Sequence, residues 1–174
     1  MTPGNIALNL SGNLDLSDGS SILTVARVQT PAAALNITAH DINITGESFL
    51  STESKSSGTG GPLNIFANNL TLMNGGQIKS GSTLGVDPDT GAPVTPSGPG
   101  GTINVQGLSG PAASVLIDGA GSGIFTNTEG TGAGGAFNLS ARSLNIQNGG
   151  TISASTKGLA LSATGGSIRS ESVV

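Results

Sequence analysis

The side chains that could carry acid–base chemistry in this chain are ten carboxylates and a single histidine, His40. Glycoside hydrolysis needs two carboxylates about 5–5.5 Å apart for retention, or about 6.5–9.5 Å apart for inversion. Across the internal repeat described below, no two acids occupy the same position of neighbouring copies, and Glu53 and Glu129 come nearest. His40 has no second ligand type clustered near it, so we interpret it as a corner residue. We therefore predict no catalytic residue, no metal site and no cofactor.

The composition excludes several further classes of function. There is no Cys, Trp or Tyr, which removes zinc fingers, disulfide frameworks, iron–sulfur sites and cysteine nucleophiles. Six basic residues against ten acidic ones give a net charge of −4, which suits a nucleic-acid backbone poorly. No apolar run approaches the ~20 residues of a membrane span. We expect neither a nucleic-acid partner nor a membrane span.

A three-part apolar pattern repeats five times along the chain. The first part is an apolar-Asn-apolar triplet: Leu8-Asn9-Leu10, Leu35-Asn36-Ile37, Leu63-Asn64-Ile65, Ile103-Asn104-Val105 and Phe137-Asn138-Leu139. A second alternating triplet follows: Leu14-Asp15-Leu16, Ile42-Asn43-Ile44, Leu70-Thr71-Leu72, Val115-Leu116-Ile117 and Leu144-Asn145-Ile146. After a turn comes one more apolar residue: Ile22, Phe49, Ile78, Ile124 and Ile152. Alternation with a period of two predicts short strands rather than helix turns.

A regularly repeated three-strand order predicts the fold. Glycine makes up 29 of the 174 residues, and with Asn and Asp it supplies the positive φ that tight corners need. We predict an all-β protein, a parallel β-helix of about five coils with three short strands each, over residues 1–174 as a single segment. Two longer steps in the period predict insertions at about 85–100 and 106–112. The alternative is an antiparallel β-sandwich, which does not require this repeating order.

The middle residue of each triplet should face outward. Asn side chains in register can hydrogen-bond along a stack, so we predict a structural ladder: Asn9, Asn36, Asn64, Asn104 and Asn138. In the third strand, the residues after the inward position form a second outward column: Leu23, Leu50, Lys79, Phe125 and Ser153. Its apolar members, Leu23, Leu50 and Phe125, form a candidate contact patch. Glu129 and Lys157 should form a surface ion pair.

Two related runs carry a family resemblance. LNIQNGGTISAST from Leu144 to Thr156, LTLMNGGQIKSGST from Leu70 to Thr83, and the GTGG- and GAGG-type joints resemble filamentous-haemagglutinin-like exoproteins of two-partner secretion, closest to the long cyanobacterial versions. The resemblance covers essentially the whole chain. It implies a right-handed parallel β-helix that forms part of the repetitive shaft of a secreted or surface-held adhesin.

The same resemblance implies the partners and the location. The partners would be a host or neighbouring cell surface, including its glycans, and an outer-membrane secretion partner for the parent protein. The Asn-Pro-Asn-Gly-Ile type motif of the family's secretion domain does not occur in this sequence, so we expect the export signal on a longer parent. The chain would act as a rigid rod that displays loops for attachment. The alternative is a carbohydrate-binding or carbohydrate-cleaving β-helix.

Overall fold

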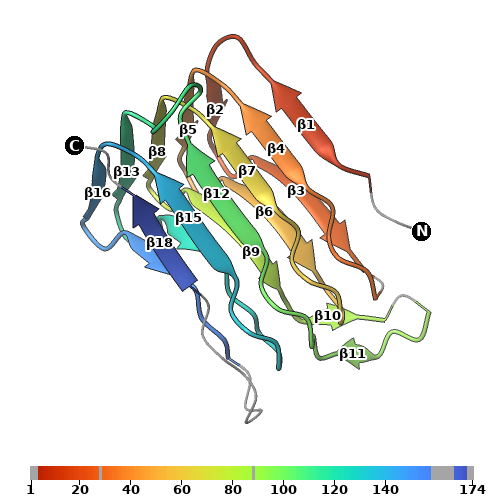
Figure 1. Ribbon diagram of the computed structural model, residues 1–174. Coiled ribbons are helices and arrows are strands. Elements are labelled where there is room, and N and C mark those ends of the chain that lie inside the picture. The colour runs from red at the N-terminus through yellow and green to blue at the C-terminus, as the bar shows by residue number, and fades with distance from the viewer. Residues whose placement is uncertain (1–3, 28, 88, 158–166, 172–174) are drawn as a thin grey trace.

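The computed structural model describes residues 4–27, 29–87, 89–157 and 167–171, and these contain strands and no helix. The chain winds through three sheets in turn (Figure 1). The first sheet contains β1 (Ile6–Asn9), β4 (Leu35–Thr38), β7 (Leu63–Phe66), β12 (Thr102–Gln106), β15 (Ala136–Ser140) and β18 (Ser167–Glu171). The second contains β2 (Leu14–Leu16), β5 (Asp41–Ile44), β8 (Asn69–Met73), β13 (Ser114–Asp118) and β16 (Leu144–Gln147). The third contains β3 (Ser21–Ala26), β6 (Phe49–Ser54), β9 (Gln77–Ser82), β14 (Gly123–Phe125) and β17 (Thr151–Ser153).

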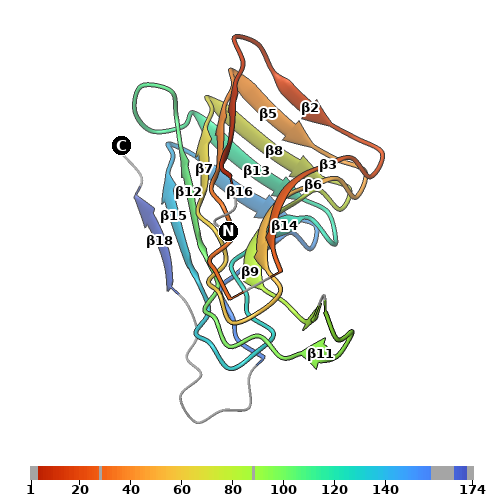
Figure 2. The same ribbon diagram turned by 90° about the vertical axis from the view of Figure 1, so that its right-hand side faces the viewer.

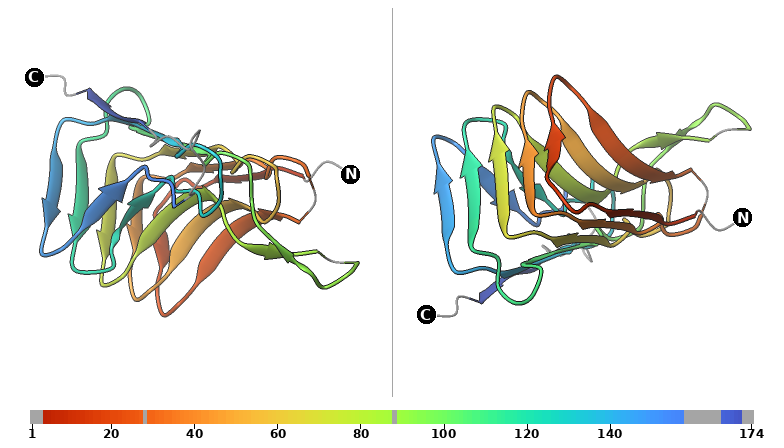
Figure 3. Two further views of the ribbon diagram at one scale, coloured as in Figure 1. Left: turned by 90° about the horizontal axis from the view of Figure 1, so that it is seen from below. Right: turned by 90° about the horizontal axis from the view of Figure 1, so that it is seen from above.

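Each strand pairs with its equivalents in the coils before and after it. All pairings within the three sheets are parallel, and the stack is seen along two further directions in Figures 2 and 3. This arrangement confirms the predicted parallel β-helix of five coils with three strands each. Residues far apart in the sequence therefore become neighbours across a single strand spacing of about 4.8 Å.

The interior is a set of stacked aliphatic columns. Within a coil, the first and second strands each turn two apolar side chains inward, and the third strand turns one inward. The fully buried members include Leu35, Ile37, Ile42, Ile44 and Leu50 in the second coil, and Leu63, Ile65, Leu70, Leu72 and Ile78 in the third. Because each coil contacts only its neighbours, stability comes from these columns and from the register between coils.

The corner between the second and third sheets is a tight turn. In the third coil it uses Asn74 with φ of 50° and Gly75 with φ of 83°, and in the fifth coil Asn148 with φ of 51° and Gly149 with φ of 89°. Glycine and asparagine tolerate this left-handed region better than other residues. The recurrent Asn-Gly pair therefore ends the second strand and aims the chain into the third.

The corner between the third sheet and the next coil is filled by inward hydroxyls. Thr52 Oγ1 and Ser80 Oγ both donate to the carbonyl oxygen of Gly61, at 2.7 and 2.6 Å. Thr24 Oγ1 donates in the same way to the carbonyl oxygen of Ala33, at 2.8 Å. These buried hydroxyls satisfy corner carbonyls that have no strand partner, which explains why Ser or Thr recurs two residues after the inward apolar residue.

The structure corrects the predicted first coil. Strand β1 places Ile6 and Leu8 opposite Leu35 and Ile37, so Ala7, and not Asn9, lies beside Asn36. Asn9 pairs with Thr38 at the strand end and is not part of the ladder. Ile6 and Leu8 are partly buried and pack against the core, whereas Leu10 is 37% exposed. Five residues separate Leu8 from Leu14, against four at this corner in the second, third and fifth coils, so the first corner is one residue longer.

The structure also corrects the orientation of β6. Leu50, and not Phe49, lies opposite Ile22 and Ile78, and Leu50 is fully buried. A shift of one residue turns every side chain of a strand to the other face. The length of the corner between the second and third strands of a coil identifies Leu50 as the inward residue. Leu50 lies six residues after Ile44, just as Ile78 lies six residues after Leu72.

Both regions expected as insertions leave the regular coil. Between β9 and β12, strands β10 (Gly85–Val86) and β11 (Pro93–Val94) form an antiparallel hairpin. Its turn is closed by Asp87, whose Oδ1 accepts the backbone N–H groups of Asp89 and Thr90 at 2.9 and 2.8 Å. In the second region, an antiparallel bridge between Gly107 and Gly110 closes a small loop.

Candidate functional site

Four of the five predicted ladder residues form a continuous chain of side-chain hydrogen bonds. Asn64 Nδ2 donates to Asn36 Oδ1 at 2.8 Å, and Asn104 Nδ2 donates to Asn64 Oδ1 at 2.7 Å. Asn138 Nδ2 donates to Asn104 Oδ1 at 2.8 Å. The two inner amides, those of Asn64 and Asn104, thus use their donor toward one coil and their acceptor toward the other, which fixes the register of the first sheet.

We expect Asn64→Ala to lower the free energy of unfolding by about 1–3 kcal/mol, because it removes two hydrogen bonds at about 0.5–1.5 kcal/mol each. The matched control is Asn9→Ala, which lies outside the ladder. Urea denaturation followed by circular dichroism measures both variants. Equal losses for Asn64→Ala and Asn9→Ala would contradict the assignment.

The outer face of the second sheet carries further links between coils. Asn43 Nδ2 donates to Asp15 Oδ1 at 2.7 Å, and Asn69 Nδ2 donates to Asp41 Oδ1 at 2.7 Å. Asp118 accepts Gln147 Nε2 and Asn148 Nδ2 at 3.0 and 2.8 Å. Sequence reasoning missed these links, although Asp or Asn at equivalent positions of adjacent copies is a readable signal.

These contacts change the acidity of three carboxyl groups. The hydrogen bond from Asn69, and then the hydrogen bond and charge of His40, hold the pKa of Asp41 below its model-compound value of 3.8. Hydrogen bonds from Asn148 and Gln147 lower the pKa of Asp118. Backbone hydrogen bonds from Thr90 and Asp89 lower the pKa of Asp87. In each case the ionised form is the one that is stabilised.

The lowered pKa values predict a loss of stability in acid. Each carboxylate contributes stability that is fully present above its unfolded pKa of about 3.9 and is lost as pH falls through its lower folded pKa. We expect Asp118→Asn to reduce the drop in urea midpoint between pH 5 and pH 2 relative to the unaltered chain. The measurement is urea denaturation of both proteins at a series of pH values. An identical acid response in the variant and the unaltered chain would contradict this role of Asp118.

The candidate contact patch is not assembled as expected. Leu50 lies in the core, whereas Leu23 is 43% exposed. Leu23 and Phe125 do share an outward column on the third sheet, but Ser51 and Lys79 lie between them. The outer face of the third sheet therefore presents mixed polar, charged and aromatic side chains, and no continuous apolar patch.

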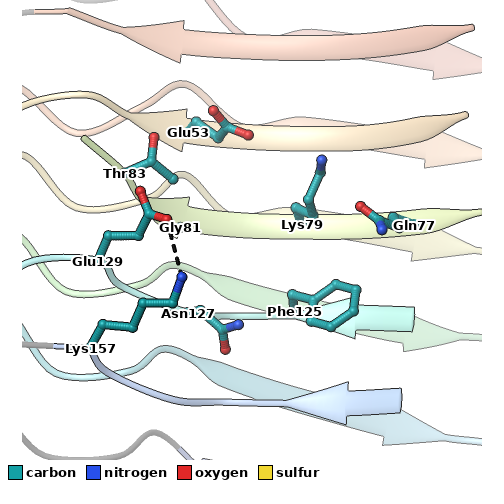
Figure 4. A pocket seen from close by; sticks show the side chains of 9 residues that line it. All are labelled: Glu53, Gln77, Lys79, Gly81, Thr83, Phe125, Asn127, Glu129 and Lys157. Atoms are coloured by element: carbon teal, nitrogen blue, oxygen red, sulfur yellow. Dashed lines mark hydrogen bonds and ion pairs between the residues drawn. The ribbon is translucent and has the colours of Figure 1, made fainter. Parts of the chain in front are cut away.

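That face carries a groove of about 290 Å³. Glu53, Gly81 and Asn127 occupy the same register position in three successive coils. Because Gly81 has no side chain, the bottom of the groove between Glu53 and Asn127 is formed by main chain. One side of the groove is lined by Lys79 and Phe125, which lie opposite each other in adjacent strands. Figure 4 shows these side chains on neighbouring strands.

The opposite side of the groove is lined by Glu129 and Lys157, joined by an ion pair of 3.5 Å as predicted. Glu129 Oε2 also accepts the backbone N–H of Leu84 at 3.1 Å. Glu53 pairs with Lys55 at 3.4 Å. Each carboxylate of the groove thus has a lysine partner.

Glu53 and Glu129, the two acids that come nearest to equivalent positions of the repeat, do line the same groove. They belong to coils two strand spacings apart, which is about 10 Å along the stack. His40 lies elsewhere, at the corner before β5, where Nδ1 is 3.0 Å from Asp41 Oδ2 and the side chain is 58% exposed. Within the described residues, no group of three or more His, Asp or Glu could hold a metal ion.

The groove combines amides, carboxylates, ammonium groups and one aromatic ring. This arrangement suits the binding of a polar ligand that has an apolar face.

The described part of the chain contains no helix long and apolar enough to cross a membrane. Comparison of the chain with protein-family models, curated proteins and solved structures returns no match.

Proposed function

We propose that this chain is a non-catalytic display and attachment segment of a secreted or cell-surface exoprotein of the filamentous-haemagglutinin-like type. The observation that carries the proposal is the hairpin β10–β11, which projects from the side of an otherwise continuous stack (Figures 2 and 3). A stack held together by columns and ladders can carry such insertions without disturbing its neighbours.

The two insertions also expose aliphatic side chains. Leu84 and Val86 at the start of the hairpin are 59% and 55% exposed, and Leu108 in the small loop is 44% exposed. Exposed apolar side chains on a projecting loop suit contact with another surface. The mechanism would be positional: the rod keeps its loops away from the surface that carries it and presents them to a neighbouring cell.

Particle attachment tests this proposal. Latex beads carrying the full chain are passed over epithelial, algal and bacterial cell layers, and the retained beads are counted. We expect retention several-fold above beads that carry an inert protein of similar size and charge. Shortening the hairpin by removing residues 87–92 should lower retention. Retention no better than that of the inert protein on every layer, with the chain folded by circular dichroism, would overturn the proposal.

The second candidate function is carbohydrate cleavage, and the observation that favours it is the presence of both Glu53 and Glu129 in one groove. Release of reducing ends or of unsaturated products from a panel of polysaccharides would support it. Glu129→Gln would then abolish that release. Binding without turnover would favour the attachment role.

A further inference from the structure

All three lysines of the chain lie on the outer face of the third sheet or directly beside it. Lys79 belongs to β9, Lys55 directly follows β6, and Lys157 follows β17 in the register position beside Glu129. Arg27 follows β3 in the same column as Lys55. Four of the six basic residues therefore gather on one side of a protein whose net charge is −4.

Lys79 differs from the other two lysines in its partners. Lys55 and Lys157 are each paired with a groove carboxylate, at 3.4 and 3.5 Å. The Lys79 ammonium lies 4.1 Å from the centre of the Phe49 ring, and within the described residues it has no carboxylate partner. A cation–π contact leaves the ammonium positively charged and able to donate hydrogen bonds. Lys79 is therefore the positive charge of the groove that remains available to a ligand.

The neighbours of Lys79 favour a ring-shaped, hydroxyl-rich ligand. Phe125, directly opposite in β14, contributes a flat apolar ring to the groove. Asn127 Oδ1 accepts Ser153 Oγ and the backbone N–H of Ser155, at 3.1 and 3.0 Å. Its Nδ2 has no partner within the described residues and can donate to a ligand. Glu129 keeps acceptor capacity beside its two contacts.

The position of the groove argues against a peptide ligand. Extended peptides bind to sheets by adding a strand at an exposed edge. The strands beneath this groove, β9 and β14, are hydrogen-bonded on both sides, so their main-chain groups are already used. Recognition must come from side chains above the face of the sheet. A saccharide, with hydroxyls around an apolar ring face, suits that kind of surface.

We propose that the groove of the third sheet binds an acidic oligosaccharide, with its anionic group on Lys79, a sugar ring against Phe125, and hydroxyls on Asn127 and Glu129. The volume of about 290 Å³ is near the lower end of the range for small-molecule sites, which fits one or two sugar units of a longer chain. The proposal deepens the attachment role and rests on it, because it names the class of surface molecule that the shaft itself would hold.

Calorimetric titration of the full chain tests this assignment with four probes of similar length. They are a galacturonic-acid tetrasaccharide, a sulfated galactose tetrasaccharide, a neutral galactose tetrasaccharide and a peptide of alternating Asp and Gly. We expect one or both acidic sugars to bind more tightly than the neutral sugar at low ionic strength, and added salt to reduce that difference. The two acidic probes decide between a carboxylate and a sulfate. Acidic sugars that bind no more tightly than the neutral sugar, or a peptide that binds as tightly as they do, would overturn the proposal.

Three variants separate the groove from general charge effects. Lys79→Gln should weaken acidic-sugar binding about tenfold or more, because it removes a charge-assisted hydrogen bond, and should leave the affinity for the neutral sugar unchanged. Phe125→Ala should weaken both kinds of sugar. Arg142→Gln makes the same change of charge at the corner before β16, outside the groove, and should bind as the unaltered chain does. Equal effects of Lys79→Gln and Arg142→Gln would refute the site.

Bead retention distinguishes failure of this site from failure of the attachment role. Beads that are retained equally with and without Lys79→Gln would support attachment and refute the groove as the contact. Tight binding of the acidic sugar in solution, together with no retention on any cell layer, would support the groove and refute attachment.

Discussion

Gly101→Ala is expected to destabilise the fold by about 3 kcal/mol or more, because it adds a methyl group to a corner in which main-chain atoms are already closely packed. An added Cβ would lie 2.5 Å from the carbonyl oxygens of both Gly60 and Gly61, and closer still to Ser80 Oγ. Real Cβ atoms essentially never lie within 3.0 Å of such atoms. The backbone cannot give way locally, because it forms the corner of the preceding coil.

The matched control for this substitution is Gly12→Ala, at which an added Cβ would meet nothing within 4 Å. Urea denaturation compares the midpoints, and circular dichroism shows whether each variant folds. We expect Gly101→Ala to be largely unfolded or to have a much lower midpoint, and Gly12→Ala to lie within about 0.5 kcal/mol of the unaltered chain. Similar midpoints for the two variants would contradict the close stacking of the glycine corners.

Leu50→Ala is expected to cost about 2–5 kcal/mol of unfolding free energy, the usual range for truncating a buried leucine. Leu50 is fully buried and lies between Ile22 and Ile78 in the third-sheet column. Alanine would leave a cavity that the two neighbouring coils can fill only in part. The loss should appear in the unfolding midpoint and not in the slope of the transition.

Leu23→Ala provides the same chemical change on the outer face of the adjacent strand, where the side chain is 43% exposed. We expect it to cost less than about 1 kcal/mol. The comparison tests the orientation of β6 directly. A small loss for Leu50→Ala with a large loss for Phe49→Ala would restore the orientation predicted from the sequence and contradict the structure.

The sequence is enough to predict the architecture because the same pattern of three strands occurs in five copies, and each copy indicates it independently. The second triplets, such as Ile42-Asn43-Ile44 and Leu70-Thr71-Leu72, take up the predicted strands and pair in the predicted register. Errors arise where one copy offers two overlapping patterns. Ile6-Ala7-Leu8 and Leu8-Asn9-Leu10 both alternate, and the following corner does not decide between them, because it is one residue longer than the usual four when counted from Leu8 and one shorter when counted from Leu10.

The groove was only partly predictable. Alternation placed Lys79 and Phe125 in one outward column, and spacing placed Glu129 beside Lys157. The sequence did not show that Gly81 would leave an open floor, because a glycine gives no sign of what surrounds it. Nor did it show that Lys79 would contact Phe49, because that contact depends on which way β6 faces.

Disulfide trapping tests the central claim, in-register stacking of the coils, most directly, and the chain has no cysteine of its own. Asn64→Cys with Asn104→Cys places two thiols on directly opposite residues of β7 and β12, within the usual disulfide reach of about 4.4–6.8 Å between Cα atoms. Asn64→Cys with Asn138→Cys places them two strand spacings apart, about 10 Å. The account predicts rapid oxidation of the first pair, measured by mass spectrometry, and none of the second. Equal oxidation of both pairs, or oxidation of the second alone, would contradict it.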